Sequence, residues 1–299
     1  MAEYSIKELE ELSGIKAHTI RIWEKRYGIV SPRRTDTNIR LYSDNDLKKI
    51  IKVSLLNNQG IKISRIAQLN PDELSLKVSE ISEKQSAPEI HIDRLVVAMV
   101  DLDEEAFELI INELIRRFGF EQALLDIIYP FLNKIGVLWL TGHITPVQEH
   151  FITLLLRQKM LVAIDGLPLP SKTAPRVILF LPDEELHELG LLFSYYLVKK
   201  AGFLAYYMGQ RVPYEDVLWF CRNRGPVAVL THITTSPPPG FVEPYLQKLC
   251  QDNPTISVLA AGPQLAKMAL KIPKNLHILQ SPDQLKEILR GLGGPNTGK

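Results

Sequence analysis

The part of the chain after Ala174 alternates between two kinds of segment, and this alternation constrains the fold more than any other feature of the sequence. Five short β-rich runs, at 176–182, 203–209, 226–233, 255–262 and 276–280, are separated by helical stretches at 187–201, 214–224, 242–252, 263–271 and 282–291. Parallel strands need long crossover connections, which are usually helices. The alternation therefore predicts a doubly wound, parallel, flavodoxin- or Rossmann-like sheet, whose ligands collect at the carboxyl ends of its strands.

The segment before this sheet is predicted to be a four-helix bundle. Apolar residues recur at three- and four-residue spacing in the stretches 92–100, 104–119, 120–140 and 145–164, as they do on the buried face of a helix. A polar stretch, SEISEKQSAPEI, precedes the bundle and indicates a linker or a fraying helix end. We therefore expect an N-terminal domain, a linker, a bundle and an α/β domain over residues 1–75, 76–90, 91–168 and 172–299.

Short helices broken by glycines make up the N-terminal region. Ser5 is placed to cap a first helix, the Ser13-Gly14 pair makes a tight turn, and a second helix is expected over residues 16–27. The segment SPRRTDTNIRLYS (31–43) then predicts two short strands around a turn. This order of elements is typical of a winged helix-turn-helix.

The charge of this region differs from the average of the chain, which carries 35 basic and 34 acidic residues. Between residues 16 and 40, only Glu24 and Asp36 oppose a run of lysines and arginines. A basic face on one module of a neutral protein is the electrostatic footprint expected for DNA, although a solvated charged surface is the simpler alternative. The ordered series of turn, basic helix and wing favours DNA, with contacts expected from Lys16, His18, Thr19, Arg21 and Arg26 on the helix and from Arg33, Arg34, Arg40 and Tyr42 on the wing. For Tyr42, packing under the wing is the alternative.

The string from Tyr4 to Ile50 strongly resembles the DNA-binding domain of MerR-family regulators. The matching features are the helix HTIRIWEKRYG, the P-R entry to the wing, and the R-L-Y exit that precedes Asp46-Leu47. LNNQGIKISRIAQL resembles the second helix pair of the family. The resemblance implies a protein that binds double-stranded DNA as a dimer at an inverted repeat and distorts the DNA between half-sites. The polar linker and the bundle replace the family's long dimerisation helix, which indicates a different kind of sensor.

A histidine follows the first predicted strand, within Pro182-Asp-Glu-Glu185-Leu-His187-Glu-Leu-Gly190. Imidazole is a good ligand for a transition metal, and a neighbouring carboxylate can hold its other nitrogen and fix its tautomer. Gly190 allows close approach of the backbone to a ligand. A solvated loop histidine or a helix cap is the alternative interpretation.

A second constellation lies in the bundle, where nine residues separate Trp139 from Glu149-His150. A large aromatic side chain and two polar ones at adjacent helix ends are suited to roof a pocket. A core tryptophan and a solvated helix start are the alternatives. The functional interpretation is favoured because both constellations occur, in order, on adjoining domains.

The bundle and the α/β domain together resemble the cobalamin-binding pair of methionine synthase and of the CarH/LitR photoreceptor regulators. Glu185-x-His187-x-x-Gly190 matches the E/D-x-H-x-x-G motif, and Trp139-x9-Glu149-His150 matches the W-x9-E-H motif of the photoreceptor subgroup. The resemblance implies a cobalamin cofactor, with adenosylcobalamin favoured. His187 is then the lower axial ligand of cobalt, oriented by Glu185.

The same resemblance implies roles for residues around the corrin. Gly190 leaves room for the corrin or its tail, Trp139 and Glu149 line the pocket of the adenosyl group, and His150 ligates cobalt after light has broken the carbon–cobalt bond. The tunnel for the nucleotide tail is lined by Thr231 and Ile233, which stand for the family's S-x-L, and by Ala261-Gly262, which stands for its Gly-Gly pair. We expect the methyl group of Ala261 to weaken tail binding, and His232 is a further departure.

The whole pattern predicts a cobalamin-controlled, light-responsive transcription regulator, which acts as a repressor and assembles as a dimer or tetramer. A cofactor-independent regulator, whose α/β domain serves protein–protein contact only, is the alternative. A cobalamin enzyme such as a mutase or methyltransferase is disfavoured because no substrate-activating barrel accompanies the DNA-binding module. The charged start of the chain, the short apolar runs and the two cysteines outside any CxxC motif predict a cytoplasmic, nucleoid-associated protein with no membrane partner.

Overall fold

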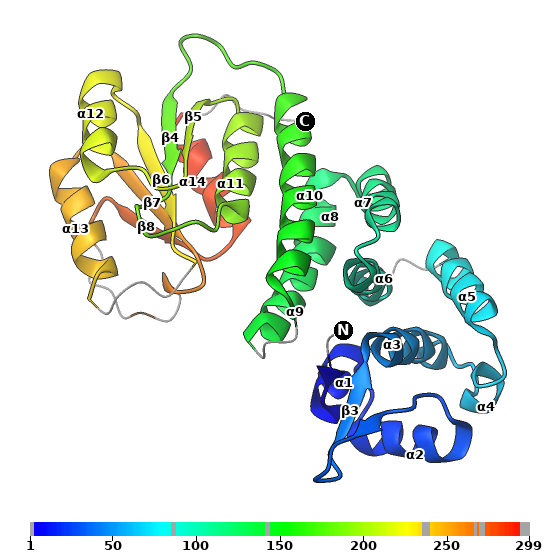
Figure 1. Cartoon of the computed structure of the whole chain (residues 1–299). Helices are drawn as coiled ribbons and strands as arrows, with labels where there is room; N and C mark the ends of the chain where they lie inside the picture. The colour runs from blue at the N-terminus through cyan, green and yellow to red at the C-terminus, as the bar shows by residue number, and fades with distance from the viewer. Residues whose placement is uncertain are drawn as a thin grey trace. The chain divides into compact units, whose positions relative to one another are not determined.

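The structure is a computed structural model of the chain (Figure 1). It describes residues 3–84, 88–140, 144–234, 240–265, 268 and 273–293, and for residues 79, 81–84 and 137–140 it describes the backbone only. The chain divides into two compact units, residues 1–155 and 156–299, and the division falls within helix α10 (Pro146–Asp165). Each unit is described by itself.

The first unit begins with the winged helix-turn-helix that the sequence predicts. Its elements are β1 (Glu3–Tyr4), α1 (Ile6–Ser13), α2 (Ala17–Tyr27), β2 (Arg33–Arg34), β3 (Arg40–Ser43) and α3 (Asp44–Asn58). The strands form a small antiparallel sheet in the order β1-β3-β2. Ser5 accepts the backbone N–H of Glu8, whose side chain accepts the N–H of Ser5, so the predicted cap of α1 is confirmed as a capping box. Gly14 takes the left-handed conformation that ends α1.

The polar stretch that the sequence presents as a linker is helical over most of its length. After the short helix α4 (Ile63–Ile66), helix α5 runs over Pro71–Lys84. Asn70 and Glu73 cap its start through reciprocal hydrogen bonds of 2.9 Å, and Leu74 and Val78, one turn apart, are buried. Of the two interpretations of this stretch, a helix end fits residues 76–84, and residues 88–90 begin helix α6.

The four-helix bundle is confirmed. It consists of α6 (Pro88–Asp101), α7 (Glu104–Phe118), a third helix formed by α8 (Phe120–Ala123), the π-helical turn η1 (Leu124–Ile128) and α9 (Tyr129–Leu140), and α10. The wide turn η1 ends two residues before Pro130, which has no N–H to continue a regular helix. The ring of Phe107 contacts those of Phe131 and Phe151 at centroid distances of 6.0 and 6.2 Å, and these rings fill the centre of the bundle.

The second unit contains the predicted parallel sheet. Its elements are β4 (Arg176–Phe180), α11 (Leu189–Lys200), β5 (Leu204–Gly209), α12 (Tyr214–Arg224), β6 (Ala228–His232), α13 (Val242–Asp252), β7 (Ser257–Ala261), β8 (Leu276–Leu279) and α14 (Pro282–Gly291). The strand order is β5-β4-β6-β7-β8, which is flavodoxin-like. Helices α12 and α13 cover one face of the sheet, and α11 and α14 lie on the other (Figure 1). The helix expected over 263–271 falls largely outside the described residues.

This topology fixes where a ligand is expected. The chain leaves β4 toward β5 on one side and returns to β6 on the other, so the switch point lies between β4 and β6. The segment that contains His187 follows β4, and Thr231 and His232 end β6. In the described part of the chain, no helix is long and apolar enough to cross a membrane.

Candidate functional site

Helix α2 presents an exposed polar face and a buried apolar one. Ile20 and Trp23 are buried, whereas His18, Arg21 and Arg26 are exposed and Thr19 is half-buried. The sequence did not single out Ile22 and Lys25 as contacts, but both are exposed. His18, Arg21, Ile22 and Lys25 follow the helical spacing of one face, which is the signal that could have found them. This face offers the donors that a major groove requires.

Acidic residues pair with several of the predicted DNA contacts. Lys16 pairs with Glu10 at 2.9 Å, and Arg33 pairs with Glu3 at 2.8 Å; both pairs are on the surface. The second oxygen of Glu10 accepts the backbone N–H of Ala17 at 2.9 Å, so this carboxylate also caps α2. Arg34 donates to the side-chain oxygen of Asn38. Within the described residues, Arg21 and Arg26 form no ion pair, which leaves them as the strongest candidates for contact with phosphate or base edges.

Glu24 joins the wing to α2. Its Oε2 lies 3.0 Å from Nε of Arg40 and accepts from the hydroxyl of Tyr42 at 3.4 Å. Tyr42 is 0% exposed, and burial together with Glu24 raises the pKa of its hydroxyl to about 12. The prediction that Tyr42 contacts DNA is therefore corrected, because its ring packs under the wing. Arg40 is half-buried and positions the wing.

The loop after β4 holds the candidate metal ligand. Oε1 of Glu185 accepts the backbone N–H of His187 at 2.8 Å and lies 2.9 Å from Nδ1 of the same residue. The Glu185 side chain is 4% exposed and that of His187 is 56% exposed. A buried carboxylate thus holds one nitrogen of an accessible imidazole. When Nδ1 carries the proton, Nε2 carries the lone pair that a metal binds.

Further hydrogen bonds fix this loop on the sheet. Oε2 of Glu185 accepts the backbone N–H of Thr234 at 2.7 Å, which ties the loop to the segment after β6. Glu188 accepts from the hydroxyl of Tyr207 at 2.7 Å and pairs with Arg157. Gln210 donates to the carbonyl of Leu186. Sequence reasoning missed Glu188, Tyr207 and Arg157, because no motif connects residues so far apart along the chain.

Thr231, which the resemblance assigns to the tunnel of the nucleotide tail, and Gly190, which it assigns to the corrin or its tail, lie on opposite sides of β6. Thr231 is 0% exposed, and its hydroxyl has no partner within the described residues. Its neighbour Ile233 belongs to the apolar cluster under α12 and α13. His232 lies between them in the strand and therefore points to the other face, toward α11. Ile233, Ala261 and Gly262 do meet, since Ile233 donates to the carbonyl of Ala261 at 2.8 Å.

Gly262 has a structural reason to be glycine. Its φ is +126°, and a Cβ added there would lie 2.1 Å from the carbonyl oxygen of Ile233. No other residue fits this approach of two backbones.

His232 occupies the space beside Gly190. A Cβ added at residue 190 would lie 2.8 Å from Nδ1 of His232, so the ring rests directly on the glycine backbone. Nε2 of His232 lies 2.8 Å from Oγ of Ser194, which is buried on α11. Burial lowers the pKa of His232 to about 4, although the Glu185 carboxylate acts in the opposite direction. The room expected at Gly190 is therefore filled by a neutral imidazole.

The bundle constellation is described only in part. Glu149 and His150 lie in the first turn of α10, as predicted; Glu149 is half-buried and His150 is exposed. Thr145 and Gln148 cap this turn reciprocally. Trp139 is in the last turn of α9, but its side chain lies outside the described residues. Its role as a pocket residue stays a prediction.

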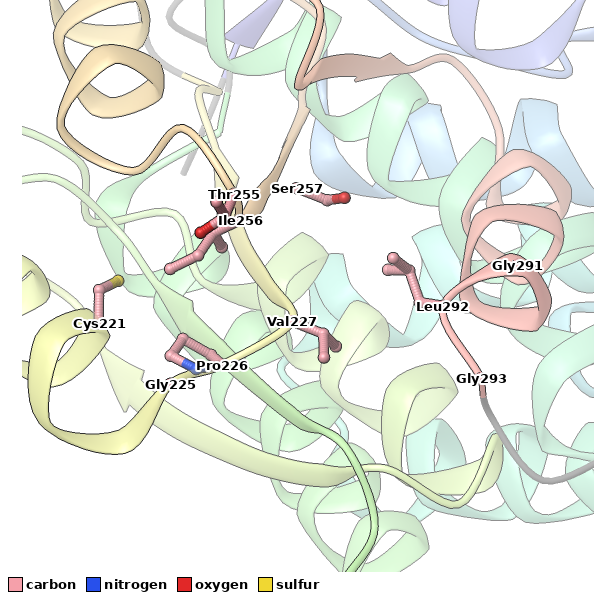
Figure 2. Close-up of a pocket in the computed structure, with 10 residues that line it drawn as sticks. All are labelled: Cys221, Gly225, Pro226, Val227, Thr255, Ile256, Ser257, Gly291, Leu292 and Gly293. Atoms are coloured by element: carbon pink, nitrogen blue, oxygen red, sulfur yellow. The ribbon is translucent and has the colours of Figure 1, made fainter.

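A pocket of about 670 Å³ opens at the opposite end of the sheet (Figure 2). Its lining comes from segments that precede β6 and β7 and from the end of α14. Cys221, which lines it, is buried, and burial raises the pKa of its thiol to about 11. Because the pocket lies at the amino ends of the strands and no charged residue lines it, we do not assign it to the ligand site.

Two models of known families match this chain, one over the helix-turn-helix and one over the helical bundle. Residues 4–72 match the MerR HTH family regulatory protein model, and residues 91–163 match the B12 binding domain model. The chain joins a MerR-type helix-turn-helix to a B12-binding domain. Two matching curated relatives come from Myxococcus xanthus: HTH-type transcriptional repressor CarH, 29% identical over 73% of this chain and 75% of the relative, and HTH-type transcriptional repressor CarA, 25% identical over 79% and 78%.

A solved structure supports the fold of this chain beyond its helix-turn-helix. The monomethylamine corrinoid protein of Methanosarcina barkeri superimposes with a TM-score of 0.54, over 68% of this chain and 98% of that protein. The sequence identity is 13%, so the similarity concerns the fold alone.

The residues at the ligand edge of the parallel sheet fit a corrinoid at one point and conflict with it at another. Within the described residues, no group of three His, Cys, Asp or Glu side chains is arranged to hold a metal ion. A single imidazole held by Glu185 suits a metal that arrives with its other ligands already in place, as cobalt does in a corrin. The orphaned Thr231 hydroxyl is a group that a ligand could satisfy. The His232 ring beside Gly190, in contrast, leaves no space there for a tail.

Proposed function

We propose that this protein is a transcriptional repressor whose DNA binding is controlled by a cobalamin. One observation carries the proposal. The Glu185–His187 pair lies at the switch point of a flavodoxin-like sheet, in a chain that begins with a MerR-type helix-turn-helix. The relatives CarH and CarA, both repressors by name, match most of this chain.

Helix α2 and the wing are the DNA-binding output. Arg21 and Arg26 supply exposed cations that no acidic residue neutralises within the described residues, and Arg34 extends the basic surface on the wing. Positive charge near phosphates provides most of the affinity, and donors on the exposed face of α2 supply sequence preference. A homodimer on an inverted repeat is the arrangement that the MerR domain implies.

His187 is the residue that would hold the cofactor. When bound, cobalamin would supply a cobalt ion that takes a histidine nitrogen as a ligand and, in the adenosyl form, a light-sensitive carbon–cobalt bond. Glu185 keeps Nδ1 of His187 engaged, so Nε2 is presented to the metal, and burial of the carboxylate strengthens this orientation. Thr234 fixes the carboxylate from its other side.

Control of DNA binding would come from assembly of protomers. Linking several helix-turn-helix domains raises their effective concentration on an operator, so a cofactor state that favours the oligomer also favours DNA binding. In the bundle, Glu149 and His150 at the start of α10 and Trp139 in α9 are the residues that, by their place in the related motif, would contact the cofactor. Light would act by changing the ligation at His150 and with it the assembly.

A cofactor-independent regulator is the second candidate. Two observations favour it: the His232 ring fills the space at Gly190, and Ala261 carries a methyl group where the related motif has glycine. In this case the α/β unit would serve protein–protein contact.

Uptake of adenosylcobalamin by the full chain in the dark distinguishes the two candidates. After desalting, the proposal predicts a protein fraction that retains the corrin absorbance, and a His187→Ala variant whose affinity is at least about tenfold lower, equivalent to about 1.4 kcal/mol. His18→Ala, which removes a histidine from α2, is the control and should bind like the wild type. Absence of corrinoid from the wild-type fraction would establish the cofactor-independent candidate instead.

A further inference from the structure

At the ligand edge of the sheet, His232 packs against Gly190. The sequence motif predicts that Gly190 leaves room for a ligand. Gly190 lies in the first turn of α11, and an added Cβ would be 2.8 Å from Nδ1 and 3.1 Å from Cε1 of His232. Both distances are shorter than an ordinary van der Waals contact of a Cβ atom, so a side chain at residue 190 would collide with the ring. The imidazole therefore uses the space that the absent side chain of residue 190 provides.

Ser194 holds the other edge of the ring. It follows Gly190 by one helical turn, so both residues face β6 from the same side of α11. Its Oγ lies 2.8 Å from Nε2 of His232, and the serine is buried. The ring thus spans from the helix backbone at Gly190 to the hydroxyl of Ser194, and it closes the gap between β6 and α11.

The position of this pair matters because it is next to the candidate cobalt ligand. Glu185, which holds His187, is within electrostatic range of His232, and the segment after His232 donates to Glu185 through the backbone N–H of Thr234. A ligand that places its metal on His187 and extends between β6 and α11 must displace the His232 ring. A ligand that ends at the corrin does not need that space.

We propose that His232 and Ser194 form a plug beside Gly190 that selects among corrinoids by their lower substituent. The inference rests on the proposed function and deepens it. The closed plug admits a corrin with no nucleotide tail, whereas a complete cobalamin binds only when the ring leaves Ser194. The plug therefore sets the specificity of the site while His187 remains the metal ligand.

Two probes that share the corrin and differ in the tail test this inference. Cyanocobalamin carries the nucleotide tail, and aquacyanocobinamide has the same ring and cyanide without the tail. Dissociation constants are measured by absorbance titration with the full-length wild type, His232→Ala and Ser194→Ala. His277→Ala, a histidine of β8 at the far edge of the sheet, is the matched control. Circular dichroism checks that each variant is folded.

The plug predicts that the wild type binds cobinamide at least about tenfold more tightly than cobalamin. His232→Ala should tighten cobalamin binding about tenfold and leave cobinamide binding unchanged, so that the two constants converge. Ser194→Ala should shift the ratio in the same direction by a smaller factor, and it keeps the test decisive if His232→Ala fails to fold. His277→Ala should behave like the wild type.

Two outcomes would overturn the inference, and they differ from each other. If all proteins bind both corrinoids and the ratio is the same in the wild type and both variants, the plug does not exist, although the proposed function stands. If neither probe binds any of the proteins, the proposed function fails and the plug fails with it.

Discussion

Glu185 and His187 make two contacts through a single oxygen: Oε1 of Glu185 accepts the backbone N–H of His187 at 2.8 Å and lies 2.9 Å from its Nδ1. The backbone contact shapes the loop, and the side-chain contact aims the imidazole. Since the same carboxylate also accepts the N–H of Thr234, one buried residue connects the ends of β4 and β6. The candidate ligand is therefore preorganised by the fold.

Replacement of Glu185 by glutamine should weaken corrinoid binding about 10- to 100-fold, the usual effect of removing the hydrogen-bond partner of a metal-bound histidine. The amide has a single acceptor oxygen, so it can keep the contact with the N–H of Thr234 or the contact with the N–H of His187, but not both. Titration of adenosylcobalamin by absorbance measures the change. Glu184→Gln, a substitution of the exposed neighbouring residue, is the control. If both variants bind adenosylcobalamin as tightly as the wild type, Glu185 does not orient His187 for metal binding.

Arg21→Ala should weaken DNA binding and reduce the salt dependence of the affinity by about one counterion in the logarithmic slope if Arg21 contacts a phosphate. If it contacts a base edge, discrimination at that position should fall by about 1–3 kcal/mol instead. Fluorescence anisotropy at several salt concentrations separates the two results. Arg290→Ala, an exposed arginine of α14, is the charge-matched control. DNA affinity that is unchanged in Arg21→Ala would mean that α2 is not the recognition helix.

Tyr42→Phe should bind DNA as the wild type does, within about twofold, because the ring is buried and the hydroxyl points to Glu24. Loss of this long hydrogen bond should cost less than about 1 kcal/mol of folding free energy. Anisotropy and thermal melting check the two statements. A tenfold loss of DNA affinity in a folded Tyr42→Phe protein would restore the hydroxyl as a phosphate contact.

Acidification should destabilise the second unit through His232. Its pKa is lowered to about 4 by burial, while an unfolded histidine has a pKa of 6.5. The unfolded state therefore binds a proton first as the pH falls, and stability present above pH 6.5 is lost progressively down to the folded pKa, by about 3 kcal/mol in full. Glu185, the charged group that favours protonation, limits this loss.

Amide hydrogen exchange of peptides from β4 and β6 measures this loss at pH 7 and at pH 5. His232→Asn keeps a polar group next to Ser194 but does not titrate, so the difference between the two pH values should shrink in the variant. The same pH dependence in both proteins would show that His232 does not titrate in this way.

The elements that the sequence predicts well are those with a strong local pattern. The five strands and the described helices between them follow the predicted apolar runs, and the cap of α1 involves Ser5 and Glu8, which are only three positions apart. The loop motif likewise predicts that Glu185 holds His187, because two residues along the chain are enough to bring them together.

The features that the sequence does not reveal depend on contacts between distant segments. Ser194 and His232 are 38 residues apart, and nothing local shows that the imidazole fills the space at Gly190. The hydrogen bond from Tyr42 to Glu24, which holds the ring under the wing, likewise joins residues that are distant in the sequence. The continuation of α5 to Lys84 is likewise hidden by the polar composition of its last residues.

The central claim is that a cobalamin at His187 controls DNA binding. The measurement that tests it most directly is the affinity of the full chain for a duplex selected by the protein from random sequence, at one salt concentration. The affinity is determined without corrinoid, with adenosylcobalamin in the dark, and after illumination. The account predicts that the dark adenosylcobalamin state binds at least about tenfold more tightly than the other two, and that His187→Ala removes this difference. The same affinity in all three states of the wild type would contradict it.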